Sequence, residues 1–136
     1  MTRTALRLRF YGDASLRRRA RPVRRVGDQE RAIVEEMAEM MRFAGGIGLA
    51  APQVGIDRQC IIVDIGQGLV VLFNPRILKR SGSAVMEEGC LSLAGALVKV
   101  RRARSVEVTG LNEKYETVTL SASDLMAWAL QHEIDH

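Results

Sequence analysis

A long stretch of strand-like sequence lies between two segments of helical character. Apolar residues recur at helical spacing between Asp28 and Ala44, and the stretch from Leu125 to His136 contains neither Gly nor Pro. Between them, residues 60–120 carry short apolar or alternating runs, which are typical of β-strands. This order predicts the α+β class, with antiparallel β-sheets packed around a C-terminal helix and one N-terminal helix. At 136 residues the chain should form a single domain over residues 1–136.

The pattern also predicts where each element begins and ends. Asp28 can cap the first helix, and Gly45 and Gly46 should stop it. Its expected core face consists of Ile33, Met37, Met40, Met41 and Ala44. Strands are expected at residues 60–65, 69–73, 77–79, 84–87, 98–101, 105–109 and 115–120, and the last two should form a hairpin with one buried face. Ser121 and Asp124 fit a capping box for the last helix.

Charge and cysteine content limit the classes of partner. The net charge is +4, and the first 25 residues hold Arg3, Arg7, Arg9, Arg17, Arg18, Arg19, Arg21, Arg24 and Arg25. We interpret this extended segment as a solvated basic face, with attraction to an RNA-rich partner such as the ribosome as the alternative. Few aromatic residues accompany the arginines, so no specific DNA binding is expected. No apolar run reaches the roughly 18 residues of a membrane span, and two cysteines indicate a reducing compartment.

The sequence ends in His132-Glu133-Ile134-Asp135-His136. Residues four apart share one face of a helix, so both imidazoles can bind the same metal ion. Glu133 lies one position further round, where its carboxylate could hold a metal-bound water and accept its proton. Histidines of the surface or core are the alternative for this motif taken alone.

A catalytic metal with two His ligands needs a third protein ligand and an open position. Cys90 is the candidate, because Gly89 before it lets the backbone approach another group closely. A small buried hydrophobe is the alternative for a lone Cys. We interpret Cys60 in that way, since it begins an apolar strand.

The segment from Gly46 to Gly55 superficially fits a dinucleotide-binding fingerprint. That fingerprint requires a strand before it and a helix after it, whereas here a helix precedes it and Pro52 interrupts what should follow. We therefore interpret the segment as a tight turn beside a substrate, with Gln53 presenting an amide donor.

Residues 46–53, 88–92 and 132–136 together resemble peptide deformylases. That family carries Gly-x-Gly-x-Ala-Ala-x-Gln, Glu-Gly-Cys-x-Ser and His-Glu-x-x-His motifs in this order, and all three stand here. The likeness extends to Arg21-Pro22-Val23, Asn74-Pro75 and Val100-x-Arg102. It implies a metallohydrolase that removes the formyl group from formylmethionyl nascent peptides by attack of a metal-bound hydroxide. A cytoplasmic location in a bacterial or phage-infected cell is implied, rather than an organelle.

The resemblance also implies a role for each motif residue. Cys90, His132 and His136 would bind one Fe²⁺ per chain, with Zn²⁺, Ni²⁺ or Co²⁺ as substitutes, although the ligand set alone would have suggested Zn²⁺. Glu133 would act as general base and then as acid. The catalytic donors to the formyl oxygen would be Gln53 and the backbone N–H of Leu91.

The methionine side chain of the substrate requires an apolar pocket. The candidates are Ile47, Met86, Leu125, Trp128 and Ala129, with plain core packing as the equal alternative. We also assign Gly48, Glu88 and Gly89 to substrate binding, and Arg102 to the site as an accessory residue.

Two features differ from the usual family pattern. Ala94 stands where the family usually has Pro, and the family usually continues past the second His, whereas this sequence stops at His136. The domain is thus short at its C-terminus, and we expect weaker metal retention. The alternative functions are an inactive or weakly active remnant that serves as a binding module, and a His-Glu-x-x-His zinc peptidase. Such peptidases usually place their third ligand downstream of the helix.

Overall fold

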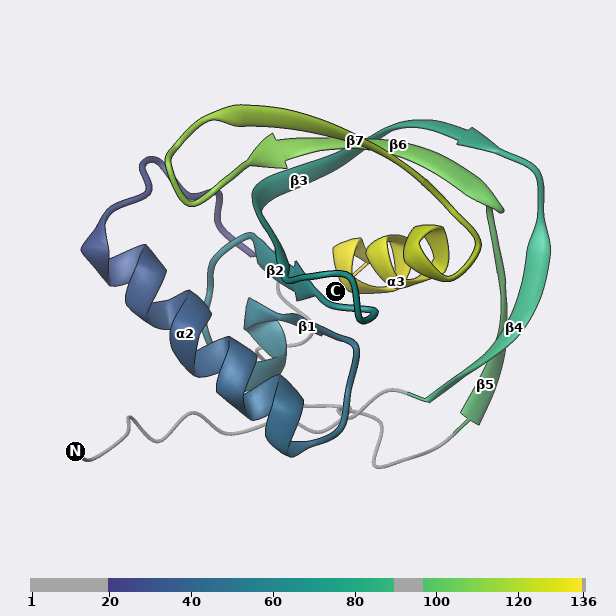
Figure 1. The fold of residues 1–136 in the computed structure, drawn as a ribbon, viewed down its shortest axis with the longest axis horizontal. Coiled ribbons are helices and arrows are strands. Elements are labelled where there is room, and N and C mark those ends of the chain that lie inside the picture. The colour runs from purple at the N-terminus through teal and green to yellow at the C-terminus, as the bar shows by residue number, and fades with distance from the viewer. Residues whose placement is uncertain (1–19, 90–96, 136) are drawn as a thin grey trace.

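The computed structural model describes residues 20–89 and 97–135, and it has the α+β architecture that the sequence predicts (Figure 1). The elements are α2 (Asp28–Phe43), β1 (Gly48–Ala50), the 3₁₀ helix η1 (Ala51–Val54), β2 (Cys60–Val63), β3 (Val70–Ser81), β4 (Ala84–Gly89), β5 (Leu97–Arg102), β6 (Ser105–Leu111), β7 (Thr117–Ser123) and α3 (Asp124–Ile134). All strand pairs are antiparallel, in one sheet of order β1-β2-β3-β6-β7 and a second sheet of β4 and β5. In this part of the chain no helix is both long and apolar enough to cross a membrane.

The boundaries of α2 are set by glycines at both ends. The helix begins at Asp28, and its N-cap is Gly27, whose N–H donates to the Glu30 carboxylate at 2.8 Å. The prediction of Asp28 as the cap was therefore wrong by one position. At the other end Gly45 has a φ of 72°, and the N–H groups of Gly45 and Gly46 bond to carbonyls of the last turn. This arrangement is a Schellman motif, and it confirms the predicted stop.

The buried face of α2 is shifted slightly from the predicted one. Its buried residues are Val34, Met37, Ala38 and Met41, with Ile33 and Met40 packed at the edge of the core. Ala44 is exposed, because the helix ends before it and the chain turns away.

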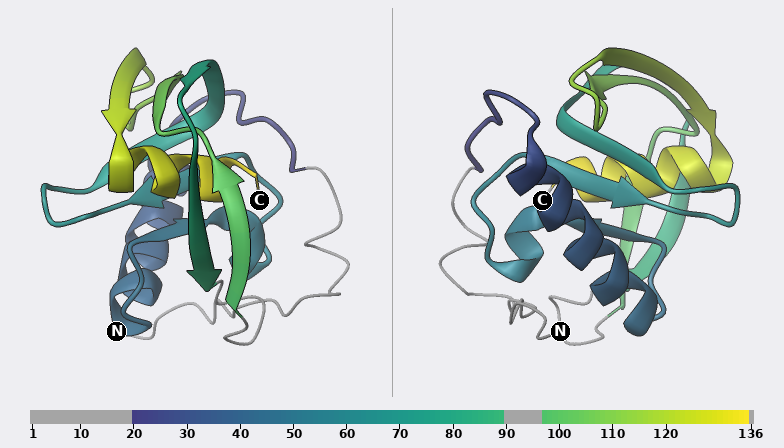
Figure 2. Two further views of the ribbon diagram at one scale, coloured as in Figure 1. Left: turned by 90° about the vertical axis from the view of Figure 1, so that its right-hand side faces the viewer. Right: turned by 60° about the vertical axis from the view of Figure 1, so that its left-hand side comes forward.

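The strands β1, β2 and β3 lie between α2 and α3, which cover opposite faces of this part of the sheet (Figure 2). Cys60 and Ile62 pack toward α2, whereas Ile61 and Val63 pack toward α3. All four residues of β2 are buried for this reason, which explains the continuous apolar run in the sequence.

Strand β3 continues through Asn74 and Pro75, where the sequence predicted two separate strands. The pairing with β6 shifts between Phe73 and Arg76, so the pair lies at a β-bulge. A bulge tolerates Pro75, which has no N–H to donate. Asn74 has a φ of 52°, and its side chain pairs with the N–H and the C=O of Val23 at 2.6 and 2.7 Å.

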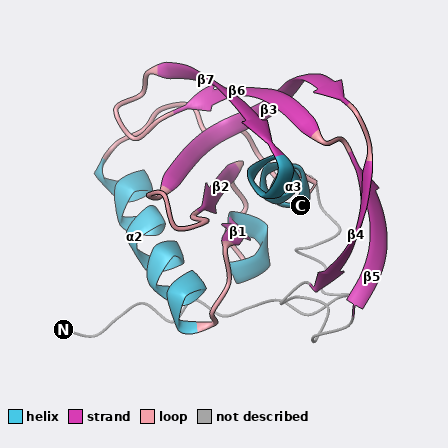
Figure 3. Ribbon diagram, turned by 45° about the vertical axis from the view of Figure 1, so that its right-hand side comes forward, coloured by secondary structure: helices cyan, strands magenta, loops and turns pink. Residues whose placement is uncertain are grey.

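The predicted hairpin is formed by β6 and β7, with one buried face. Tyr115 belongs to the turn, with a φ of 62°, so the second strand begins later than expected. The N-cap of α3 is Ser123, and Ser121 lies within β7, so the predicted capping box does not form. Strands β3, β6 and β7 arch over α3, and β4 and β5 pass beside it (Figures 1 and 3).

Candidate active site

Helix α3 presents the two described residues of the His-Glu-x-x-His motif. His132 is half-buried and Glu133 is buried, at 5% exposure. The indole of Trp128, one turn earlier, stacks on the His132 ring with centroids 5.8 Å apart and an interplanar angle of 28°. This contact restricts how the imidazole can turn.

The carboxylate of Glu133 lies directly against the main chain of β1. A Cβ atom at Gly48 would be 2.6 Å from Glu133 Oε2 and 2.9 Å from its Cγ. No L-side chain fits there unless the carboxylate moves. The second glycine of the Gly-x-Gly motif is therefore required by a contact between two distant segments, in addition to any turn that it makes.

The side chain of Gln53 is fixed by its own main chain. Gln53 lies in η1 at 2% exposure, and its Oε1 accepts a hydrogen bond from the Ala50 N–H at 2.9 Å. Because the amide oxygen faces Ala50, the amide NH₂ group is directed the other way. Donation by this amide to a substrate stays a prediction.

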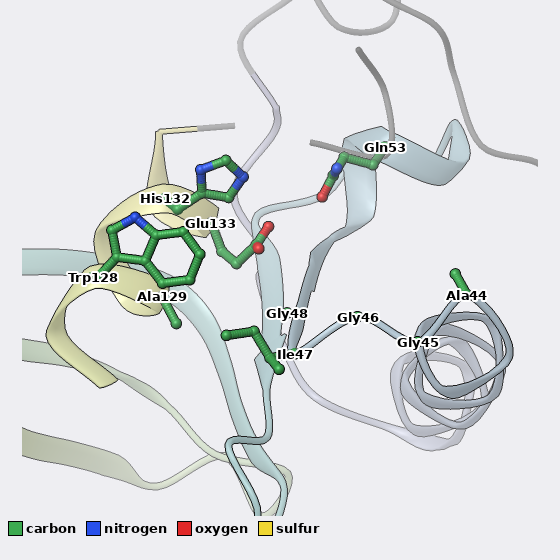
Figure 4. Close-up of a pocket in the computed structure, with 10 residues that line it drawn as sticks. All are labelled: Ala44, Gly45, Gly46, Ile47, Gly48, Gln53, Trp128, Ala129, His132 and Glu133. Atoms are coloured by element: carbon green, nitrogen blue, oxygen red, sulfur yellow. The ribbon is translucent and has the colours of Figure 1, made fainter. Parts of the chain in front are cut away.

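These groups meet at an open pocket of about 210 Å³ (Figure 4). Its described lining consists of Ala44, Gly45, Gly46, Ile47, Gly48, Gln53, Trp128, Ala129, His132 and Glu133. Ile47 and Ala129 lie on one side of the Glu133 carboxylate and Gln53 lies on the other (Figure 4). The pocket thus combines an apolar wall, a buried carboxylate, an imidazole and an amide.

Ala44 and Gly45 were not predicted to line the site, whereas Gly46 begins the segment that was interpreted as a turn beside a substrate. The signal that could have found them is the predicted helix stop. It turns the chain from α2 into β1, so the residues of the turn must lie beside Gly48.

Leu125 does not line the pocket, although the sequence placed it there. Its exposed fraction is 43%, and it lies seven residues before His132 on α3. Seven residues of helix span about 10 Å, which places Leu125 at the opposite end of α3 from the site.

Several predicted site residues lie outside the described residues, or in the part of a strand whose side chains are not described. Cys90, Leu91, Ala94 and His136 are outside the described residues, as is the basic segment before residue 20. Met86, Glu88 and Gly89 belong to β4, which is described by its backbone pairing with β5. Their roles therefore stay predictions.

Among residues 20–89 and 97–135, no three His, Cys, Asp or Glu side chains form a group that could hold a metal ion. Of the three expected ligands, this part of the chain includes His132 alone. Cys60 is buried in the core between α2 and the sheet, at 2% exposure. Burial, with a smaller effect of Glu113, raises the pKa of its thiol to about 12, which disfavours the thiolate needed for metal binding. These observations support the interpretation of Cys60 as a core residue.

Two further polar side chains connect α3 to the end of β5. Arg102 forms an ion pair with Asp135, and it is absent from the described pocket lining. Gln131, buried at 3% exposure, hydrogen-bonds the main chain of Ala103. Gln131 was not predicted from the sequence. The signal that could have found it is a lone polar amide directly after the apolar residues 125–130.

Residues 5–136 match the family model of polypeptide deformylase. The chain belongs to the peptide deformylase family. The peptide deformylase of Halothermothrix orenii is 46% identical over 133 residues, which cover 96% of this chain and 86% of that protein. The family is metal-dependent, which agrees with the ligands that the motifs predict.

Solved peptide deformylases share the fold. The crystal structure of the enzyme from Thermotoga maritima superposes with a TM-score of 0.93 at 39% identity, covering 96% of this chain and 90% of that one. The enzyme from Synechococcus elongatus, solved in complex with actinonin, gives a TM-score of 0.94 at 40% identity, covering 100% of this chain and 75% of that one. Both the family and the α+β prediction are thereby confirmed.

Proposed function

We propose that this chain hydrolyses the formyl group from the N-terminus of formylmethionyl peptides. The observation that best supports this proposal is the buried Glu133 carboxylate, which lies against Gly48 and beside His132 in an open pocket. Family membership supplies the reaction class, and the pocket supplies groups suited to it. Neither the zinc peptidase nor the inactive remnant is favoured.

The donor set supports a bound metal ion. Cys90, His132 and His136 would supply one sulfur and two nitrogen ligands, which leaves an open position of the kind that catalytic sites keep. The described member, His132, faces the pocket beside Glu133. Fe²⁺ is proposed from the resemblance, with Zn²⁺, Ni²⁺ or Co²⁺ able to occupy the same ligands. When bound, the metal would act as a Lewis acid toward water and the formyl carbonyl.

Glu133 is the proposed proton carrier. Its carboxylate would accept a proton from the attacking water and then deliver it to the leaving amine. Contact with Gly48 holds it at the pocket wall, so little reorganisation is needed during the reaction.

Gln53 would stabilise the formyl oxygen as negative charge develops on it. The Ala50 N–H holds Gln53 Oε1, so the NH₂ group is oriented before substrate arrives. The N–H of Leu91 is the second proposed donor. One such donor is typically worth about 3 kcal/mol in the transition state.

The edge of β1 and its neighbours would bind the rest of the substrate. Ile47 O accepts from Asp64 N on the β2 side, so alternation along the strand turns the N–H and C=O of Gly48 away from β2. An extended peptide could pair with them as an added strand. Its methionine side chain would lie against Ile47, Trp128 and Ala129.

The replacement Glu133→Gln tests the proposed function. It keeps the size of the side chain and removes the proton acceptor, so deformylation of formyl-Met-Ala-Ser should fall by roughly 10²–10⁴-fold. Metal content, measured by elemental analysis of anaerobically prepared protein, should not change. If the wild type cleaves unformylated internal peptides and not formyl-Met-Ala-Ser, the zinc peptidase would be favoured. If the wild type and Glu133→Gln are equally active, the proposed role of Glu133 would be overturned.

We further propose a cytoplasmic location, where formylated nascent peptides arise. Contact with the ribosome is proposed on charge alone. Within the described residues Arg21, Arg24 and Arg25 are exposed, and such attraction should weaken as salt concentration rises.

A further inference from the structure

The amide of Gln131 joins α3 to the connection between β5 and β6. Its Nε2 donates to the carbonyl of Ala103 at 2.8 Å and to that of Ala127 at 3.0 Å, while its Oε1 accepts from the Ala103 N–H at 2.9 Å. It thus pairs with both main-chain groups of Ala103, as a neighbouring strand would. Because Gln131 is buried, the loss of this pairing would leave polar groups without water to replace it.

A second contact joins the same two segments one turn later. Asp135 lies four residues after Gln131, on the same face of α3, and pairs with Arg102, the neighbour of Ala103. The Arg102 side chain is 14% exposed, whereas that of Asp135 is 53% exposed. Two consecutive residues of the connection therefore hold two successive turns of one helical face.

These contacts fix how α3 is rotated about its axis. Each residue of a helix is turned by roughly 100° from the one before it, so His132 and Glu133 follow Gln131 round the helix at fixed angles. If the face of Gln131 and Asp135 is fixed to Arg102 and Ala103, the direction in which His132 and Glu133 point is fixed too.

The connection leads directly into the other proposed part of the metal site. Arg102 ends β5, which pairs with β4 from Ala84↔Arg102 to Gly89↔Leu97. Cys90 is the next residue after Gly89. The two contacts therefore join the helix that carries His132 to the hairpin that carries Cys90 in the sequence.

We propose that Gln131 and the Arg102–Asp135 pair are positioning residues, which align α3 with the β4–β5 hairpin so that ligands from both segments can meet at one metal ion. The proposal rests on the proposed function. Residues that orient metal ligands typically change metal affinity or activity by about 10–100-fold when they are replaced. A change of that size is expected here.

Asn74 provides a matched control within the chain. Its amide pairs with the N–H and the C=O of Val23 in the same manner, and it is absent from the described pocket lining. Gln131→Glu and Asn74→Asp each replace one amide NH₂ by an oxygen without changing the size of the side chain. Both replacements should lower the melting temperature.

Of these two variants, Gln131→Glu alone should also raise the rate of metal loss to a chelator by about tenfold or more and lower kcat, with KM changed by less than about twofold. Asp135→Asn should show the same changes in metal loss and kcat, but more weakly, because Asp135 is more exposed. This variant should stay folded, so it tests the proposal even if Gln131→Glu fails to fold. Equal metal loss and equal kcat in the Gln131, Asp135 and Asn74 variants would overturn the proposal. A wild type without bound metal or deformylase activity would instead overturn the proposed function.

Discussion

At the scale of single residues, the site depends on contacts between positions far apart in the chain. Gly48 and Glu133 are 85 residues apart in sequence, yet the Glu133 carboxylate occupies the space that a Cβ at Gly48 would need. The Gln53 amide is oriented locally, by the Ala50 N–H three residues earlier. If Glu133 and Gln53 act as proposed, the general base and the amide donor are already in place before substrate binds, which reduces the reorganisation that the reaction requires.

Gly48→Ala should reduce catalysis while the fold persists. The new methyl group would meet Glu133 Oε2 at 2.6 Å and force the carboxylate away, and Ala is compatible with the extended conformation of β1. We expect kcat to fall by roughly 10²-fold or more, the size of effect that a misplaced general base produces. Steady-state kinetics would measure kcat, and circular dichroism would show whether the fold persists.

Gly46→Ala is the matched control for this replacement. Among the described residues beyond its chain neighbours, the nearest atom to a Cβ at Gly46 would be Gly48 O at 3.7 Å, so this variant should lose much less activity. Equal losses in the two variants would show that displacement of Glu133 is not the cause.

Cys60 should make stability depend on pH in the alkaline range. Burial raises the pKa of its thiol from 9.0 to about 12, so unfolding allows it to ionise where the native protein does not. The stabilisation is complete below pH 9 and should be lost progressively between pH 9 and pH 12. Urea unfolding of the wild type across this range would measure the loss.

The variant Cys60→Ala separates this effect from other groups that titrate above pH 9. The difference in unfolding free energy between wild type and variant should shrink as pH rises. A constant difference would contradict the prediction. The variant should also keep its metal, since Cys60 is not an expected ligand.

At the scale of elements, different faces of α3 contact the core, the end of β5 and the pocket. Ala127 and Leu130 pack into the core beneath β3 and β6. Gln131 faces the end of β5, while Trp128 and His132 face the pocket. One helix of 11 residues therefore joins the core, the hairpin and the site, so its rotation matters more than its helical propensity.

Trp128→Leu should broaden the preference for the first residue of the substrate. Trp128 lines the pocket, and a smaller side chain would leave room beyond that needed for methionine. The ratio of kcat/KM for formyl-Met to formyl-Phe peptides should fall by about tenfold, within the range typical of pocket-volume changes. Competition between the two peptides would measure this ratio directly.

Leu125→Ala is the control on the same helix, since Leu125 is exposed outside the pocket. It should leave the ratio unchanged. An unchanged ratio in Trp128→Leu would remove Trp128 from the specificity pocket.

At the scale of the whole molecule, the pocket lies where α3 meets β1, η1 and the turn from α2 into β1. Strands β1 to β3 have α2 on one face and α3 on the other, and the turn from α2 into β1 meets the active face of α3 (Figure 2). The described sides of this pocket are formed by α3, β1, η1 and the turn between α2 and β1. In the proposed reaction, this arrangement would hold Glu133 and Gln53 at fixed positions relative to the substrate.

Local patterns in the sequence predict much of this architecture. Helical spacing identified α2, and the absence of Gly and Pro identified α3. Alternation identified the β6–β7 hairpin, and glycines identified the end of α2. These features depend on neighbours a few residues away, so they can be read from the sequence. The spacing of three motifs likewise identified the family, which the comparisons confirm.

Only the tertiary structure decided the features that depend on distant segments. The amide of Asn74 meets Val23, and a bulge lets β3 continue through Pro75, where local turn signals predicted a stop. Leu125 lies beyond the pocket, although its spacing suits the face of His132. The need for glycine at position 48 and the pairing of Gln131 with Ala103 arise from packing between remote residues. Periodicity gives the direction of a side chain on its own element, whereas its contacts depend on how the elements pack.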